Sequence, residues 1–347
     1  MPDLKVVAIT GSYGKTSTKD ILYTLLWKKY YVVKTPKSFN TPLGVSQTIL
    51  EDVKANTDIF IAEVGAYKKG EIKKIANLIT PQIGIITAIA PQHLERFKTI
   101  ENIAYAKFEL VESLPKNGLA ILNSASEWLK KLWPNSPCTV SFYGYDSDYK
   151  VQNIKLSLSG TSFQLLTPKG KADINIPLIG EHHAYNFLAA AVAALKLGIS
   201  LDEIKSRAGL LLPTPHRMEI KSLGNITLID NSFNSNSESA KSSLSLLGSF
   251  DDTKKIVVTP GFVELGKESS VRNRAFGEDI AKVADEIIIV GENAKEDLLR
   301  GVQKVFRSEE TIHFAASTQD ALVLAQQLMQ GTKGVVLLEN DLPDQYN

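Results

Sequence analysis

The hydrophobic pattern of the first third of the chain alternates between two kinds of segment. Short continuous apolar runs occupy residues 5–9, 58–63, 83–87 and 119–123. Between them lie stretches with helical spacing of apolar positions, such as residues 100–114. Continuous apolar strands that alternate with helices are typical of a parallel sheet covered on both faces. The pattern therefore predicts an α/β domain with a mostly parallel sheet.

The pattern changes in the middle of the chain. Residues 139–179 carry short alternating runs separated by turn signals, which predict a small antiparallel addition. An Ala-rich helix over residues 186–197 then closes the first domain. Residues 212–216 contain two prolines and no periodicity, so we place the linker there. We expect a first domain at 1–212 and a second at 213–347.

Strands and helices alternate again after the linker, which predicts a second, smaller, Rossmann-like α/β domain. The expected strands are 226–229, 256–259, 286–290 and 335–338, and the expected helices are 238–247, 271–284, 294–305 and 318–329.

Length and composition agree with two ordinary globular domains. The chain has 347 residues, more than the roughly 250–300 at which a single core stops growing. Its 39 basic and 38 acidic residues give a net charge of +1, so no overall field attracts nucleic acid, and we expect no nucleic-acid partner. The single cysteine, Cys138, excludes an internal disulfide and a cysteine-built zinc site. Because no apolar run approaches the ~20 residues that cross a bilayer, we expect a cytoplasmic protein.

The strongest local signal lies between the first strand and the first helix. Glycines there let backbone N–H groups face an anion at a helix N-terminus. Lys15 would add charge at the β and γ phosphates, and the Thr16 hydroxyl can bind Mg²⁺. The alternative is a Gly-rich turn with a solvated lysine. Because Ile9 stands where the common P-loop motif has its first glycine, we expect a shorter variant. The candidate ATP contacts are Gly11, Ser12, Tyr13, Gly14, Lys15, Thr16 and Ser17.

Five further residues are candidates by position. Glu63 ends an apolar strand at the edge where α/β folds bind ligands, although a surface acid is the alternative. His93 is by itself more typical of a hydrogen-bonded loop histidine, and Lys107 of a solvated helix residue. Arg217 could reach a γ phosphate when the domains close, or form an interdomain salt bridge. Asp230 ends the first strand of the second domain, again an expected ligand edge.

These segments, in this order, resemble the Mur ligases of bacterial cell-wall synthesis and their folylpolyglutamate synthetase relatives. Among family members, the spacing is most similar to the D-alanyl-D-alanine-adding branch. The resemblance covers essentially the whole chain and is carried by residues 11–19, 38–45, 62–66, 91–95, 103–107, 180–186, 216–219, 230–234 and 263–266.

The resemblance implies an ATP-dependent amide ligase whose site lies in the cleft between a P-loop domain and a C-terminal ligase domain. ATP would convert a carboxylate of a peptide precursor to an acyl phosphate, and the amine of an amino acid or dipeptide would displace phosphate. One rival function is a folylpolyglutamate-type or other peptide-adding ligase. Another is a catalytically silent ATP-binding subunit of a complex.

The resemblance also implies roles for single residues. Glu63 and His93 would bind Mg²⁺, and Lys107, carbamylated by CO₂, would hold a second Mg²⁺. Asn186, by itself a possible helix cap, would contact adenine, and Arg217 and Asp230 would contact ATP. The implied substrate contacts are Phe39, Asn40, Thr41 and Asn234.

The sequence departs from the family pattern in several places, among them Asn40-Thr41 where the family has Asn-Asn and His183 where asparagine is common. The phosphate loop starts at residue 11, so we expect the front domain that grips the uridine diphosphate end of the precursor to be absent. Either the chain is trimmed, or a membrane or partner element holds the precursor. The usual Asp-Asp pair is Asp230-Asn231, and residues 338–344 lack the expected basic Gly-Ser-Arg stretch. These changes leave the ATP chemistry intact and leave the acceptor and the added amine open.

Overall fold

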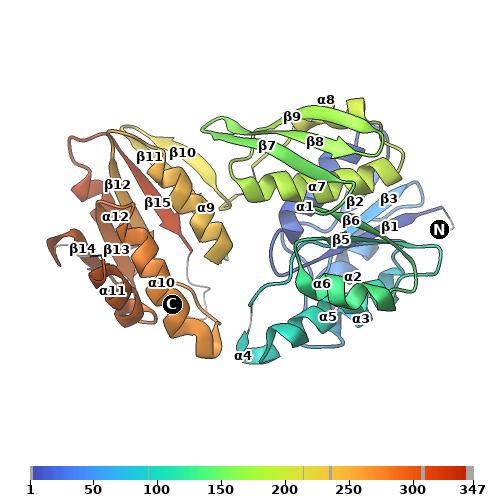
Figure 1. Ribbon diagram of the computed structural model, residues 1–347, viewed down its shortest axis with the longest axis horizontal. Helices are drawn as coiled ribbons and strands as arrows, with labels where there is room; N and C mark the ends of the chain where they lie inside the picture. The colour runs from blue at the N-terminus through green and yellow to red at the C-terminus, as the bar shows by residue number, and fades with distance from the viewer. Residues whose placement is uncertain (1–2, 93, 214, 234–236, 306–308, 341–347) are drawn as a thin grey trace. The chain divides into compact units, whose positions relative to one another are not determined.

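The computed structural model describes residues 3–92, 94–213, 215–233, 237–305 and 309–340. The chain forms two compact units, Met1–Leu212 and Pro213–Asn347. Figure 1 shows that each unit has its own central sheet with helices against it. Within the described residues, no helix is long and apolar enough to cross a membrane.

The first unit is built on a six-stranded sheet in which every neighbouring pair is parallel. The central strand β1 lies between β3 and β4, with Ile9 opposite Glu63 and Thr10 opposite Ile86. The carboxyl ends of these three strands therefore meet at one edge, where ligand sites form in such sheets. In spatial order the strands are β2 (Val32–Lys34), β3 (Ile59–Glu63), β1 (Lys5–Thr10), β4 (Ile83–Ile86), β5 (Leu119–Asn123) and β6 (Thr139–Tyr143).

Helices cover both faces of this sheet (Figure 1). Val7 and Ile9 of β1 belong to one hydrophobic cluster, and Val6 and Ala8 belong to another. Successive side chains of a strand point to opposite faces, so burial of both faces explains the continuous apolar runs. On the first face lie α1 (Lys15–Leu26), α7 (Glu181–Lys196) and α8 (Leu201–Ala208); on the other lie α2 (Pro42–Glu51), α3 (Glu71–Ile79), α4 (Leu94–Phe97), α5 (Ile100–Glu112) and α6 (Glu127–Leu132).

A three-stranded antiparallel sheet packs on α7 (Figure 1). Its strands are β7 (Lys150–Ser157), β8 (Gly160–Thr167) and β9 (Gly170–Ile176). The alanines of α7 are fully buried between the two sheets, and their small side chains let the layers approach closely. Sequence analysis wrongly assigned residues 139–143 to this addition. They form β6, which pairs parallel with β5, because a half-covered edge strand has the same mixed pattern as a hairpin strand.

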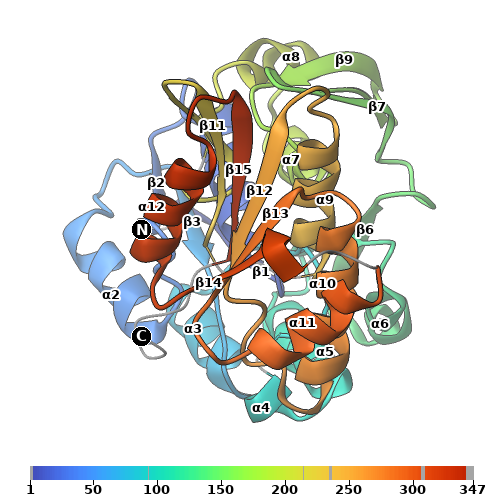
Figure 2. The same cartoon turned by 90° about the vertical axis from the view of Figure 1, so that its left-hand side faces the viewer.

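The second unit contains a six-stranded sheet in which only the edge strand β10 runs antiparallel to its neighbour. Figure 2 shows α12 on one side of this sheet and α9, α10 and α11 on the other. The strands, in spatial order, are β10 (Glu219–Leu223), β11 (Ile226–Asn231), β15 (Gly334–Glu339), β12 (Lys254–Thr259), β13 (Glu286–Val290) and β14 (Ile312–Ala315). The helices are α9 (Ser237–Gly248), α10 (Ser269–Ala281), α11 (Lys295–Gln303) and α12 (Thr318–Leu328).

The predicted fold class is confirmed: a mostly parallel sheet with a small antiparallel addition, followed by a Rossmann-like α/β unit. Sequence analysis did not predict the short strand β2, the edge strands β10 and β14, or the helices α2, α3 and α8. The strands β2, β10 and β14 are short or lie at a sheet edge, so their hydrophobic periodicity is weak, whereas α3 buries Ile72, Ile75, Ala76 and Ile79 at helical spacing and its signal was present in the sequence. The remaining short turns of 3-10 helix are Trp133–Asn135, Gly266–Glu268 and Glu309–Thr311.

Candidate active site

The Gly-rich segment forms a loop between β1 and α1, at the edge where three strands end. Gly14 is the N-cap residue of α1 and has a φ of 80°, a left-handed conformation that favours glycine. Because the N-cap residue is glycine, no N-cap side chain occupies the N-terminus of the helix, where the first backbone amides lie. Such amides, with the helix dipole, form an anion site. The side chains of Ser12, Thr16 and Ser17 are buried beside it.

The segment after β4 holds this loop in one shape. The Ser12 amide donates to the Ala88 carbonyl over 2.8 Å, and the Ser12 hydroxyl donates to the Ala90 carbonyl over 2.8 Å. Thr87 Oγ1 donates to the Tyr13 carbonyl. A Cβ atom at Gly11 would lie only 1.9 Å from Thr87 Oγ1, so only glycine fits this close contact. The loop backbone is therefore preorganised before any ligand binds.

Lys15 folds back over the loop. Its Nζ donates to the carbonyls of Gly11, at 2.9 Å, and Ser12, at 3.3 Å. The charge of Lys15 also lowers the pKa values of both Glu63 and Lys107. These three groups therefore lie within electrostatic range of one another at the phosphate loop.

Glu63 ends β3 and is 1% exposed. Its Oε2 lies 3.1 Å from Nζ of the buried Lys19, and its Oε1 accepts a hydrogen bond from Asn40 Nδ2 over 3.1 Å. Burial by itself raises the pKa of Glu63, but the charges of Lys19 and Lys15 and the bond from Asn40 outweigh burial and lower it. Glu63 is therefore an ionised, buried carboxylate rather than the surface acid considered from sequence.

Lys107 is a buried amine on α5, 4% exposed. Burial first, and then the positive charge of Lys15, holds its pKa well below the usual range of lysine. Among the described residues, no hydrogen bond or ion pair reaches its Nζ. Lys107 is therefore not the solvated lysine considered from the sequence, and its lowered pKa favours the neutral, nucleophilic amine.

The segment before α2 lies beside Glu63. Asn40 connects the two, because its carbonyl also accepts the Gly65 amide over 2.8 Å. The Thr41 side chain is the N-cap of α2 and accepts the Gly44 amide over 3.3 Å. Phe39 is 40% exposed beside them. Thr41 thus has a structural role, whereas the Phe39 ring has solvent-accessible surface for a ligand.

Asn186 does not begin a helix, so the sequence-based reading of this residue as a helix cap is wrong. Helix α7 begins at Glu181 with Gly180 as its N-cap, and an acidic residue in the first turn favours that start. Asn186 is buried within α7, and its Oδ1 would lie 2.4 Å from a Cβ atom at Gly14. Its amide therefore contacts the phosphate loop.

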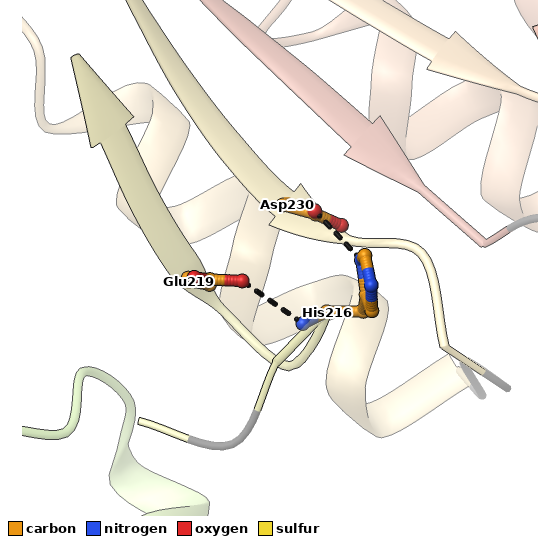
Figure 3. A group of neighbouring side chains, drawn as sticks. All are labelled: His216, Glu219 and Asp230. Atoms are coloured by element: carbon orange, nitrogen blue, oxygen red, sulfur yellow. Dashed lines mark hydrogen bonds and ion pairs between the residues drawn. The ribbon is translucent and has the colours of Figure 1, made fainter. Parts of the chain in front are cut away.

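In the second unit, a polar network holds the segment that carries Arg217 (Figure 3). His216 Nδ1 lies 2.9 Å from Asp230 Oδ2, and the His216 amide donates to Glu219 Oε2 over 3.2 Å. His216 and Met218, on either side of Arg217, have left-handed φ values of 62° and 54°. Such conformations cost about 1–3 kcal/mol each and persist where surrounding contacts enforce them.

His216, Glu219 and Asp230 have ligand atoms within 4.8 Å of one another, as a metal site requires. However, Lys221 Nζ lies 2.8 Å from Asp230 Oδ2 and 3.1 Å from Glu219 Oε2. An ammonium group therefore already bridges the two carboxylates, and we assign no metal to this group. Burial raises the pKa of Asp230, but hydrogen bonds from Lys221, Ser232 and His216 outweigh it and lower the value.

Two domain families match this chain, one in each unit. The Mur ligase middle domain matches residues 9–194, and the Mur ligase glutamate ligase domain matches residues 216–339. This chain belongs to the Mur ligase family. The resemblance inferred from the ordered motifs is thereby confirmed.

Relatives of this Mur ligase are similar along almost its whole length. The UDP-N-acetylmuramoyl-tripeptide–D-alanyl-D-alanine ligase of Escherichia coli is 32% identical, over 96% of this chain and 75% of that protein. A crystal structure of MurF from Acinetobacter baumannii has a TM-score of 0.87 at 26% identity and covers 98% of this chain and 74% of that one. MurF ligase from Thermotoga maritima, in complex with ADP, has a TM-score of 0.84 at 25% identity, over 97% of this chain and 76% of that one.

Two predicted site residues of this Mur ligase, His93 and Asn234, lie outside the described residues. Two lysines at these sites were not predicted from the sequence: Lys19, the buried partner of Glu63, and Lys221, which bridges two carboxylates. Lys19 had a recognisable signal, because it follows Lys15 by one helical turn on the same helix. Lys221 had no recognisable signal in the sequence, because its partner Asp230 lies on the neighbouring strand.

Proposed function

We propose that this chain is an ATP-dependent amide ligase that adds D-alanyl-D-alanine, or a similar amine, to a cell-wall peptide precursor. One observation carries the proposal: Lys15, Glu63 and Lys107 gather at the phosphate loop of a chain that is similar along its length to D-alanyl-D-alanine ligases.

The reaction has two displacement steps. An oxygen of the acceptor carboxylate attacks the γ phosphorus of ATP, the bond to the ADP oxygen breaks, and an acyl phosphate forms. The amine nitrogen then attacks the acyl carbon, the bond to the phosphate oxygen breaks, and a proton leaves the nitrogen for water. Lys15 and the loop amides stabilise the charge on the transferring phosphoryl group, because they are preorganised and partly removed from water.

Mg²⁺ belongs to the proposal, and the residues at the loop fit it. Glu63 offers a buried ionised carboxylate and Thr16 a buried hydroxyl, and oxygen atoms are the ligands that Mg²⁺ prefers. When bound, Mg²⁺ would neutralise charge on the phosphates. His93 remains a predicted ligand outside the described residues.

Carbamylation of Lys107 is also proposed. The neutral amine nitrogen would attack the carbon of CO₂ and lose a proton, which yields an anionic carbamate with two oxygen atoms. Burial supports this step because it lowers the pKa of the amine and so favours the unprotonated form. The carbamate oxygens would then be additional ligands for Mg²⁺.

The remaining residue roles stay predictions. Asn186 is proposed to contact adenine, which its position against the phosphate loop supports. Arg217 and Asp230 of the second unit are proposed nucleotide contacts. Phe39, Asn40, Thr41 and Asn234 are proposed acceptor contacts. A membrane or partner element that holds the precursor is a further proposal; titration of precursors with and without their nucleotide end would test it.

Phosphate release from ATP across a panel of acceptors and amines tests the function. We expect release only when a muramoyl-tripeptide acceptor and D-alanyl-D-alanine, or a similar dipeptide, are both present. A Lys15→Met variant is the matched control for contaminating ATPases, because it removes the charge and keeps most of the side-chain length. Release with a folate-type acceptor and glutamate would replace the proposal by its first rival. Tight ATP binding without release for any pair would favour the silent subunit.

A further inference from the structure

Lys19 is a fully buried lysine that the mechanism above does not use. It lies on α1, 0% exposed, one turn after Lys15. Its Nζ lies 3.1 Å from Glu63 Oε2 and also donates to the carbonyl of Lys37. Removing an ammonium and a carboxylate from water costs several kcal/mol per ion, so a buried pair is weak evidence for a role in stability alone. Its position next to the candidate metal ligand suggests another role.

Lys19 and Asn40 together hold both oxygens of the Glu63 carboxylate. Lys19 contacts Oε2, and Asn40 Nδ2 donates to Oε1 over 3.1 Å. The backbone on the same side is shaped for this arrangement, since Lys37 has a left-handed φ of 45° and its carbonyl accepts from Lys19. A single ammonium thus connects α1, the end of β3 and the segment that carries Phe39 to Thr41.

We propose that Lys19 is a positioning residue, which fixes the Glu63 carboxylate in the orientation that a divalent cation beside the phosphates requires. This inference rests on the proposed function, because it takes Glu63 as a metal ligand. Each carboxylate oxygen has two lone pairs, so the contacts with Lys19 and Asn40 leave acceptor capacity for a cation. Partners that orient a ligand in this way commonly decide metal affinity.

Charge and orientation predict opposite changes in metal affinity when Lys19 is removed. Lys19 is itself a cation, and its charge opposes a second cation at Glu63. If charge alone mattered, removal of Lys19 would tighten metal binding. If orientation dominates, as we propose, removal weakens metal binding, because the carboxylate loses the contact that fixes its Oε2 and turns away.

The test is titration of the folded chain with Mn²⁺, followed by electron paramagnetic resonance, in the presence of a non-hydrolysable ATP analogue. We expect Lys19→Met to weaken Mn²⁺ binding about tenfold or more, as loss of an orienting partner does elsewhere. Lys34→Met is the matched control. Lys34 of β2 pairs at 2.5 Å with Asp20, which lies on α1 next to Lys19, but the side chains of Lys34 and Asp20 are both about 30% exposed. We expect that variant to bind Mn²⁺ like the unmodified chain.

Unchanged or tighter Mn²⁺ binding by Lys19→Met overturns the inference. If Lys19→Met does not fold, Lys19→Met/Glu63→Gln, which leaves no unpaired charge, is compared with Glu63→Gln alone. If these two variants bind Mn²⁺ with equal affinity, Lys19 acts on the metal through Glu63, as proposed. If the double variant binds Mn²⁺ more weakly than Glu63→Gln, Lys19 acts in another way and the inference is overturned. If the unmodified chain itself binds no Mn²⁺ with the analogue, the metal assignment in the proposed function fails instead.

Discussion

Replacement of Lys107 by methionine should make the first unit more stable and the enzyme inactive. Methionine has nearly the same length and shape, and it has no polar atom that needs a partner. Lys107 is buried, and no described residue offers its Nζ a hydrogen bond or an ion pair. The side chain therefore costs folding free energy, and a role in the reaction is the reason to keep it.

The size and pH dependence of the gain follow from two contributions. A fully buried polar group without a partner costs about 1–3 kcal/mol even when neutral, and this range is an upper bound for Lys107, which is 4% exposed. Burial and the charge of Lys15 also lower the pKa of Lys107, so the folded chain has released a proton that the unfolded chain keeps up to about pH 10.4. Wild-type stability therefore rises with pH in this window, by about 1.4 kcal/mol per pH unit. Lys107→Met lacks this slope, so its advantage shrinks as the pH rises from the lowered pKa of Lys107 toward pH 10.

Urea unfolding followed by tryptophan fluorescence measures this effect in the correct unit. The chain has three tryptophans, Trp27, Trp128 and Trp133, and all belong to the first unit. Unfolding curves at pH 7, 8 and 9, in CO₂-depleted buffer without nucleotide, give the free energies of unfolding. Lys116→Met is the control, because Lys116 is exposed and should show neither a gain nor a pH-dependent difference.

Two results would refute this reasoning. Destabilisation by Lys107→Met of more than about 1 kcal/mol would mean that the amine makes net favourable contacts. A gain that does not change between pH 7 and 9 would mean that the folded chain does not release the proton.

Three further predictions concern the other charged groups. Lys15→Ala should abolish phosphate release and leave the fold intact, since the Lys15 Nζ hydrogen bonds to the Gly11 and Ser12 carbonyls are local to the loop; wild-type-like release would contradict the P-loop assignment. Activity should fall in CO₂-depleted buffer and return with bicarbonate, and mass spectrometry that finds an unmodified Lys107 in active, Mg²⁺-bound enzyme would exclude the carbamate. Asp230→Asn should speed hydrogen exchange in β11 at pH 7, because hydrogen bonds to the ionised carboxylate keep its pKa lowered. That contribution is lost as the pH falls through the lowered pKa, so the difference between the two proteins should begin to shrink only below about pH 4, and equal exchange at pH 7 would contradict it.

The sequence determined the elements whose signal is local. Buried strands such as β1 and β3 appear as continuous apolar runs, and the phosphate loop appears as glycines and a lysine between a strand and a helix. These features depend on residues close together in the chain, so periodicity and turn chemistry predict them. The order of the motifs along the chain was enough to identify the family.

The place of the edge strands β6 and β10 in their sheets depends on which strand each one pairs with, and the hydrophobic pattern of the segment does not reveal this. Residues 139–143 look like part of a hairpin, yet they form the parallel edge strand β6. The antiparallel strand β10 gives no clear signal either, because it is covered on one side only and is mostly half-buried. In both cases the neighbouring strand, which is distant in sequence or unknown in direction, determines the role of the segment.

Only the tertiary structure decided the state of the charged site residues. Glu63 and Lys107 are a possible surface acid and a possible solvated lysine in the sequence. In the structure, burial raises the pKa of Glu63 but nearby positive charges outweigh it and keep the carboxylate ionised, whereas burial lowers the pKa of Lys107 and favours the neutral amine. The difference arises because Glu63 meets Lys19 and Asn40 from other segments, whereas no described residue pairs with Lys107. Electrostatic energies depend on distance and exposure in three dimensions, and neither is encoded in the spacing of residues along the chain.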